Sequence, residues 1–352
     1  MGEKFLMKGN EVIAEAALRA GCRFYFGYPI TPQTEIAHYL AKKMPEVGGT
    51  FLQAESETAA INMVYGAASA GVRVMTSSSS PGISLKQEGI SFIACAELPA
   101  VIVNIVRCGP GLGGILPAQC DYFQAVKGGG HGDYKMVVLA PYSIQELYEL
   151  TVDAFNISDK YRTITMIMGE GILGQMMETV EFKDVENNIH IEKPWATTGT
   201  GMKREKNIIT SIYIKPEVLE EHNRKLQAKY KEIEKNEIRV ESYNCEDADV
   251  IVAAFGTVAR IISNVIPMAQ KEGIKVGLIR PISLWPFPVK EFEKYAHVPK
   301  AFLTVELNAG QMLEDVRLAV NGKKPVHFHG RMGGMIPDEA EILEEIKKIT
   351  RS

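Results

Sequence analysis

The sequence predicts an α/β protein whose first half forms a doubly wound parallel sheet and whose last third forms a smaller α/β block. Over residues 1 to about 175, short apolar runs alternate with segments of helical character, as in a parallel sheet covered by helices. The chain has 352 residues, more than one hydrophobic core usually supports, so two domains and a connector are expected. We expect the first domain over residues 1–178, the connector over 179–246 and the second domain over 247–352.

Apolar runs bounded by turn residues define the strands of the first block. Pro81 and Pro141 lie at the start of two expected helices, where proline is accepted in the first turn. The stretch over 108–134 is long and rich in glycine, and such loops inside a compact domain tend to carry function. Strands are expected near residues 24–26, 50–54, 72–76, 100–106, 136–140 and 163–168, and helices near 10–20, 33–44, 57–70, 83–96 and 143–159.

A change to polar and charged composition marks the connector. Its segment 217–235 is expected to be a solvated or interfacial helix. Prolines at 281, 286 and 288 exclude a helix over 281–288. The second block is expected to hold a strand over 250–256, a helix over 258–271 and strands over 275–280 and 301–306.

The overall composition limits the classes of partner. A net charge of −4 gives no electrostatic reason to expect nucleic acid or an anionic membrane as a partner. The N-terminus lacks a signal pattern and no apolar run reaches about 18 residues, so a cytoplasmic protein is expected. The five cysteines are dispersed without a Cys-x-x-Cys pair, so we expect no metal or iron–sulfur site on this chain, although Cys108 adjoins Arg107.

Three polar side chains lie next to predicted strand ends in the first block. The run Tyr28-Pro29-Ile30-Thr31-Pro32 follows the strand near 24–26, Glu57 begins a helix, and Arg107 closes the strand near 100–106. In open parallel sheets ligands gather at the carboxyl ends of the strands, so Thr31, Glu57 and Arg107 are expected to converge on one crevice. A hydroxyl, a carboxylate and a guanidinium there suit an anionic substrate and a proton transfer.

Each of these residues also has an ordinary structural interpretation. Threonine is a suitable cap for the helix that begins near Gln33, and a carboxylate such as Glu57 is favoured in any first helical turn. Arg107 could serve an ordinary surface ion pair. The run from Gly109 to Gly114 matches G-x-G-x-x-G, but Pro117 interrupts the helix that a dinucleotide site requires.

Several motifs taken together resemble the alpha subunit of the 2-oxoacid:ferredoxin oxidoreductases over nearly the whole chain. The resemblance is greatest to the 3-methyl-2-oxobutanoate (2-ketoisovalerate) type across residues 51–89 and 122–141. It implies a pyrimidine-type domain of the thiamine-diphosphate enzymes followed by a smaller transketolase C-terminal-like α/β domain. The motifs are residues 28–32, Glu55-Ser56-Glu57-Thr58-Ala59-Ala60, Thr76-Ser77-Ser78-Ser79-Ser80-Pro81-Gly82, residues 98–107, Leu278-Ile279-Arg280-Pro281 and Trp285-Pro286-Phe287-Pro288.

The resemblance implies an activity and roles for the residues of the crevice. The reaction is the coenzyme A-dependent oxidative decarboxylation of a 2-oxoacid to an acyl-CoA and carbon dioxide, with electrons passed to ferredoxin, as in anaerobic metabolism. Glu57, in preference to Glu55, is implied to bind the pyrimidine ring of thiamine. Arg107 is implied to hold the substrate carboxylate and Thr31 to steady the developing oxyanion. The run from Tyr28 to Ile30 is implied to contact the cofactor.

The chain lacks the Gly-Asp-Gly sequence with which thiamine enzymes hold magnesium and the diphosphate. The resemblance therefore implies a beta subunit that holds thiamine diphosphate with Mg, and a ferredoxin-like subunit that carries iron–sulfur clusters, with or without a gamma subunit. Coenzyme A is expected near the second domain. The isolated chain is expected to be inactive.

Other interpretations stay open at this point. A 2-oxoglutarate:ferredoxin oxidoreductase needs a second cation near Arg107, whereas residues 108–118 are glycine-rich and apolar, which favours a branched-chain or aromatic substrate. A thiamine-dependent decarboxylase half without electron transfer and an inactive scaffold are the alternatives from other classes. Arg280 and the run Arg331-Met332-Gly333-Gly334 are interpreted as exposed turns that contact phosphate or another subunit, with a structural role as the alternative.

Overall fold

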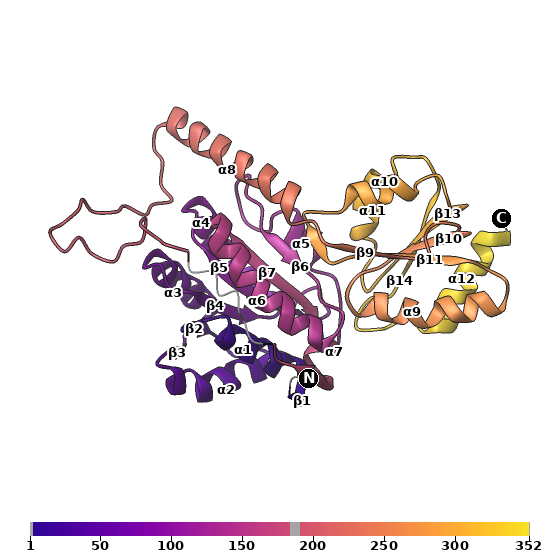
Figure 1. Ribbon diagram of the computed structural model, residues 1–352, viewed down its shortest axis with the longest axis horizontal. Coiled ribbons are helices and arrows are strands. Elements are labelled where there is room, and N and C mark those ends of the chain that lie inside the picture. The colour runs from indigo at the N-terminus through magenta and orange to yellow at the C-terminus, as the bar shows by residue number, and fades with distance from the viewer. Residues whose placement is uncertain (1–2, 184–190, 352) are drawn as a thin grey trace.

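The computed structural model describes residues 3–183 and 191–351, which form two separate main sheets (Figure 1). The first sheet has seven strands in the order β12-β6-β7-β5-β4-β2-β3, and the second has five in the order β14-β13-β10-β11-β9. The described part of the chain contains no helix that is both long and apolar enough to cross a membrane.

The first sheet contains all the strands expected for the first block, paired in parallel, together with one added strand. β4, β5 and β7 are buried on both faces, which explains why their sequences read as continuous apolar or small-residue runs. The predicted helices are also present, with ends shifted by at most two residues. The elements are β2 (Phe24–Gly27), β3 (Thr50–Gln53), β4 (Val74–Ser78), β5 (Ala100–Val106), β6 (Val137–Leu139), β7 (Ile164–Glu170), α1 (Gly9–Arg19), α2 (Thr34–Lys43), α3 (Glu57–Ser69), α4 (Pro81–Cys95) and α6 (Ile144–Tyr161).

Several short elements of this block were not expected from the sequence. β1 (Lys4–Lys8) pairs antiparallel with β8 (Met177–Glu181), so the beginning and end of the block form a two-stranded ribbon. The glycine-rich loop contains the five-residue helix α5 (Tyr122–Val126). The remaining short helices are η1 (Pro45–Val47) and α7 (Gly171–Gln175).

The second sheet follows the connector helix α8 (Pro216–Asn236), which matches the expected charged helix and runs along the first block (Figure 1). One face of α8 is buried through Leu226, Tyr230 and Ile233. The residues 184–190 of the predicted connector lie outside the described residues. The second sheet and its helices are β9 (Val240–Tyr243), β10 (Val250–Ala253), β11 (Val276–Pro281), β13 (Ala301–Glu306), β14 (Val326–Gly330), α9 (Gly256–Lys271), α10 (Val289–Tyr295), α11 (Met312–Val320) and α12 (Glu339–Arg351).

The segment that proline excludes from a helix forms a strand of the first sheet. β12 (Ser283–Trp285) pairs antiparallel with β6, with Ser283 opposite Leu139 and Trp285 opposite Val138. The chain therefore passes from β11 of the second sheet to β12, which forms one edge of the first sheet.

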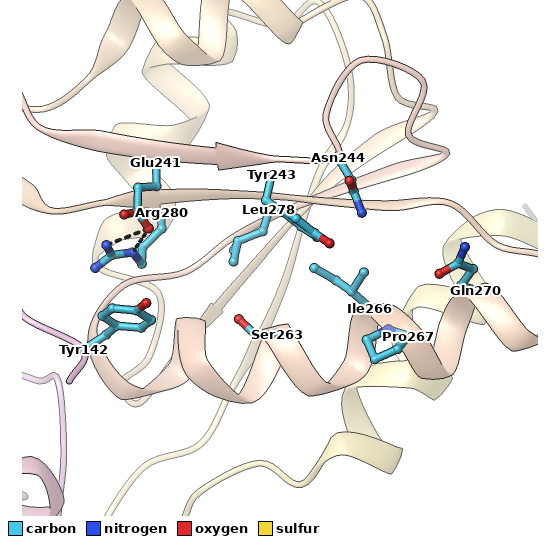
Figure 2. A pocket seen from close by; sticks show the side chains of 10 residues that line it. All are labelled: Tyr142, Glu241, Tyr243, Asn244, Ser263, Ile266, Pro267, Gln270, Leu278 and Arg280. Atoms are coloured by element: carbon cyan, nitrogen blue, oxygen red, sulfur yellow. Dashed lines mark hydrogen bonds and ion pairs between the residues drawn. The ribbon is translucent and has the colours of Figure 1, made fainter. Parts of the chain in front are cut away.

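Arg280 is not the exposed turn that we expected, because it lies within β11 and is only 1% exposed. Its guanidinium donates to both oxygens of Glu146 on α6, at 2.8 and 2.9 Å, and to Glu241 on β9 at 3.1 Å. Its Cζ lies 4.0 Å from the centre of the Tyr142 ring. Figure 2 shows Arg280, Glu241 and Tyr142 at one end of a ≈ 450 Å³ pocket between α9 and strands β9 and β11. The arginine thus joins the two blocks.

Replacing Arg280 with methionine is expected to lower the free energy of unfolding by about 3–5 kcal/mol, because it leaves Glu146 as a poorly solvated carboxylate without its partner. Urea unfolding monitored by circular dichroism measures the change. Arg224→Met is the matched control, since Arg224 pairs with Glu220 on the exposed surface of α8 and its loss should cost about 1 kcal/mol or less. Equal losses in the two variants would contradict a structural role for the buried pair.

Gln119 and Glu170 make a second junction between the blocks. Gln119 is fully buried; its backbone amide donates to the Leu307 carbonyl at 3.0 Å, and the Leu307 amide donates to the side-chain oxygen Oε1 of Gln119 at 3.0 Å. Its Nε2 donates to Glu170 Oε1 at 2.6 Å, and the Thr257 amide donates to the same oxygen at 3.1 Å. A Cβ at Gly256, which has φ +55°, would collide with this carboxylate, so the junction requires glycine there.

Burial raises the pKa of Glu170 from 4.5 to about 7. A carboxyl with a raised native pKa contributes stability below pH 4.5 that is lost as the pH rises through about 7. Between these values the wild-type chain should lose about 3 kcal/mol more unfolding free energy than Glu170→Gln, whose neutral amide cannot ionise. Urea titrations of both proteins across this pH range test the expectation, and parallel pH profiles would contradict it.

Candidate active site

The turn between β4 and α4, residues 78–82, lies at the centre of the candidate site. It follows β4 at the carboxyl edge of the first sheet, with β5 and β2 as the neighbouring strands. The loop with Thr31 follows β2, and Arg107 follows β5. Two of the predicted residues, Thr31 and Arg107, therefore lie at this edge of the sheet, one on each side of the turn.

Glu57 lies against this turn from the other side. It is the first residue of α3, whose N-cap Ser56 accepts a hydrogen bond of 3.1 Å from the Ala59 amide. The Glu57 side chain is only 5% exposed, whereas Glu55 is exposed, which supports the preference for Glu57. A Cβ at Gly82 would lie 2.7 Å from Glu57 Oε1 and closer still to Ser78 Oγ. Glycine at position 82 is therefore what allows the carboxylate to approach the turn.

Arg107 contacts both the turn and the Thr31 loop. Its backbone amide donates to Ser80 Oγ at 3.1 Å, and that hydroxyl donates to the Arg107 carbonyl at 3.0 Å. The guanidinium donates to the Thr31 carbonyl at 3.0 Å and to the Leu112 carbonyl at 3.2 Å. Only 9% of Arg107 is exposed. These partners are neutral carbonyl groups, so the positive charge of Arg107 stays available to attract an anion.

The loop after β2 presents the remaining predicted residues. Tyr28, Pro29 and Thr31 are exposed, and Ile30 is half-buried. The structure brings Thr31 to Arg107 through its backbone carbonyl, which leaves its exposed side chain facing solvent. A cap on α2 is not formed by this side chain, since the N-cap residue of that helix is Gln33.

Sequence reasoning missed a buried polar network beneath the site. Ser77 Oγ lies 2.7 Å from the Tyr25 hydroxyl and donates to Gln33 Oε1 at 2.5 Å. Asn104 accepts from the Ser80 amide at 3.2 Å and donates to Asp121 at 2.8 Å. The signal was present in the sequence, because a run of serines and a single asparagine interrupt strands that are otherwise apolar.

Four polar atoms at this edge are buried without a hydrogen-bond partner among the described residues: Gln33 Nε2, Ser78 Oγ, Ser79 Oγ and Arg107 Nε. Buried polar groups are normally paired, so a cluster of unpaired ones indicates that a ligand completes them. Hydroxyls, an amide, a guanidinium and a carboxylate fit a nitrogen-containing ring and a carboxylate group. Within the described ranges, no three His, Cys, Asp or Glu residues are grouped so that they could hold a metal ion.

A cavity of ≈ 760 Å³ opens beside this edge, a volume suited to a small ligand. Its walls come from the start of α4, from the glycine-rich loop and from the second block at residues 307–311 and 332–333. Cys108 and Cys120 both line it, and burial raises the pKa of the Cys120 thiol to about 12. The Cys120 thiol is therefore protonated at neutral pH.

The fold is that of a thiamine-diphosphate enzyme subunit. Over 98% of each chain, it matches the structure "Split gene transketolase, inactive beta4 tetramer" with a TM-score of 0.62, and 12% identity makes this a likeness of fold alone. Residues 15–242 match the family "Pyruvate flavodoxin/ferredoxin oxidoreductase, thiamine diP-bdg", and residues 248–342 match "Pyruvate:ferredoxin oxidoreductase core domain II". The chain belongs to the 2-oxoacid:ferredoxin oxidoreductase family, which confirms the expected family.

Comparison with individual proteins shows which members of the family the chain resembles. The chain is 49% identical to "Ketoisovalerate oxidoreductase subunit VorB" of Methanothermobacter marburgensis, over 98% of this chain and 97% of the relative. It is 34% identical to "2-oxoglutarate synthase subunit KorA" of Methanothermobacter thermautotrophicus over the full length of both. Among solved structures, a 2-oxoglutarate:ferredoxin oxidoreductase from Magnetococcus marinus, with 2-oxoglutarate, coenzyme A and succinyl-CoA bound, matches 99% of this chain with a TM-score of 0.90 and 28% identity. This chain spans 66% of the length of that one.

Proposed function

We propose that this chain is the alpha-type subunit of a thiamine-diphosphate-dependent 2-oxoacid:ferredoxin oxidoreductase that acts on a branched-chain 2-oxoacid, 3-methyl-2-oxobutanoate being the first candidate. The observation that carries the proposal is the convergence of buried Glu57 and Arg107 on the turn 78–82, beside polar atoms that lack partners. The 49% identity to a ketoisovalerate oxidoreductase subunit supports the substrate class.

The residues at the turn fit the pyrimidine end of thiamine diphosphate. When bound, this cofactor supplies the nucleophilic carbon for attack on the 2-oxo group and accepts the electrons released on decarboxylation. Glu57 would hydrogen-bond a ring nitrogen and exchange a proton with it. Tyr28, Pro29 and Ile30 would contact the cofactor from the loop after β2.

Arg107 and Thr31 would bind the substrate. The guanidinium of Arg107, whose Nε lacks a partner, would hold the carboxylate, and the Thr31 hydroxyl would donate toward the 2-oxo oxygen. The residues lining the ≈ 760 Å³ cavity include one acid, Asp121, and no Lys, Arg or His. A second substrate carboxylate would find no counter-charge there, which supports a monocarboxylic substrate over 2-oxoglutarate.

Other components would come from partner subunits. This chain lacks Gly-Asp-Gly, so a beta subunit would hold the diphosphate with Mg, and a ferredoxin-like subunit would carry the iron–sulfur clusters and pass electrons to ferredoxin. Coenzyme A would approach through the cavity, where residues 307–311 of the second block form one wall.

The test is an assay of the chain assembled with its beta and cluster-bearing partners. Coenzyme A-dependent reduction of a low-potential viologen is measured with 3-methyl-2-oxobutanoate, 2-oxoglutarate, pyruvate and indolepyruvate. The expected result is the highest kcat/KM with 3-methyl-2-oxobutanoate. A preference for 2-oxoglutarate would replace the proposed substrate, and inactivity of a cluster-loaded complex with all four would overturn the oxidoreductase function.

A further inference from the structure

Lys86 is a buried cation close to the candidate active site. Its side chain lies on α4 and is fully buried, and Nζ donates to Thr76 Oγ1 on β4 at 2.9 Å. A hydroxyl is a weak partner for an ammonium group removed from water, because burial of a charge is costly unless an opposite charge compensates it. The role of this lysine is not explained by packing alone, since an apolar side chain of similar size would fill the same space at lower cost.

The arrangement of α3 and α4 directs Lys86 toward Glu57. Gly82, Lys86 and Gly89 are spaced four and three residues apart on α4, so they share one face of that helix. A Cβ at Gly82 would lie 2.7 Å from Glu57 Oε1, and one at Gly89 would lie 2.5 Å from Ile61 Cγ2. The two glycines thus bring α4 against the first turns of α3, and Lys86 lies between them on the contact face.

The charges of the two residues act on one another inside this contact. Burial lowers the pKa of Lys86 to about 8, and the negative charge of Glu57 opposes that lowering. Glu57 on α3 is the charged group that acts on Lys86 within the described part of the chain, and β4 contributes the neutral hydroxyl of Thr76.

We propose that Lys86 is a positioning residue whose buried ammonium serves as the counter-charge of the Glu57 carboxylate at the active site. The coupling is a property of this chain, whereas its meaning for catalysis rests on the proposed function. An ionised Glu57 can accept a hydrogen bond or a proton from a ring nitrogen, while a neutral one cannot accept the proton. The buried lysine would therefore act on the reaction through Glu57 without touching substrate or cofactor.

The experiment is an infrared pH titration of the full chain without substrate, in which the spectrum of Glu57→Gln is subtracted to isolate the Glu57 carboxyl band. Lys86→Met removes both the charge and the hydrogen bond to Thr76, whereas Lys86→Gln removes the charge and retains a donor. In both variants the Glu57 carboxyl band is expected to titrate at a higher pH than in the wild-type chain, because loss of a nearby opposite charge disfavours the ionised form. An unchanged Glu57 pKa in both, or a change in Lys86→Met alone, would overturn the proposal.

A reciprocal measurement covers the case in which the Lys86 variants do not fold. Glu57→Gln is nearly isosteric, and by linkage it should lower the pKa of Lys86, read from ¹³C NMR of lysine labelled at Cε. An unchanged Lys86 pKa would also overturn the proposal. Neither titration involves turnover, so their failure is distinct from the failure of the assembled enzyme to oxidise any of the four 2-oxoacids.

Discussion

Substitution of Glu57 by glutamine is expected to lower kcat of the assembled oxidoreductase by about 10²–10⁴, the usual contribution of a positioned acid or base. The amide has nearly the same size, so it should preserve the close approach to Gly82 and the capped start of α3. What it loses is the ability to exchange a proton with the cofactor ring. Steady-state viologen reduction measures the effect.

Glu55→Gln is the matched control for this prediction. Glu55 lies two residues earlier and its side chain is exposed, so its substitution should leave kcat within a factor of about two, as for a surface position without a special role. If Glu57→Gln were as active as Glu55→Gln, the buried carboxylate would be a partner of the helix dipole alone, and the proposed catalytic role would be wrong.

Substitution of Arg107 by methionine is expected to lower kcat/KM for the 2-oxoacid by about 10²–10³, because truncating one side of a buried, charge-assisted contact costs about 2–5 kcal/mol. The loss should appear mainly as a raised KM, since the guanidinium binds the carboxylate before the reaction and during it. Arg107→Lys should recover only part of the affinity, because an ammonium group cannot reproduce the paired hydrogen bonds of a planar guanidinium.

The same arginine also holds the Thr31 and Leu112 carbonyls, so a loss of local structure must be separated from a loss of binding. Thermal unfolding of the variant supplies that check. Arg331→Met removes a cation next to Met332 at the cavity wall, where Arg331 pairs with Glu341, and it should leave KM nearly unchanged. A similar rise in KM for Arg331→Met would indicate a general effect of positive charge and contradict direct binding by Arg107.

The sequence allowed prediction of the parallel strands of the first sheet, the largely exposed β3 included, but not of β1, β8, β9, β12 or β14. β5 is apolar except for Asn104 and its residues are all buried, so its pattern had no competing interpretation. β1, β9 and β14 carry charged or polar residues on exposed positions, and each is defined by a partner strand that is distant in sequence. Pairing of this kind leaves no local pattern.

The residues of the candidate site could also be predicted only in part. Thr31, Glu57 and Arg107 could be proposed because chemistry gathers at the carboxyl ends of strands, and the structure places the Thr31 backbone in contact with Arg107 and places Glu57 against the adjoining turn. Gln33 and Ser77 were missed because they are fully buried polar residues joined by a hydrogen bond between segments that are distant in sequence. The strand predicted over residues 72–76 stopped two residues short of the end of β4 at Ser78, because serine residues such as Ser77 and Ser78 are typical of loops.

The antiparallel pairing of β12 with β6 has a consequence for any attempt to dissect the protein. A chain shortened to residues 1–246 would retain every parallel strand of the first sheet, yet it would expose the free N–H and C=O groups of Val137–Leu139 along an apolar edge. Unprotected edges of this kind recruit strands from other molecules. We expect the shortened chain to self-associate through β6 and therefore not to behave as an independently soluble unit.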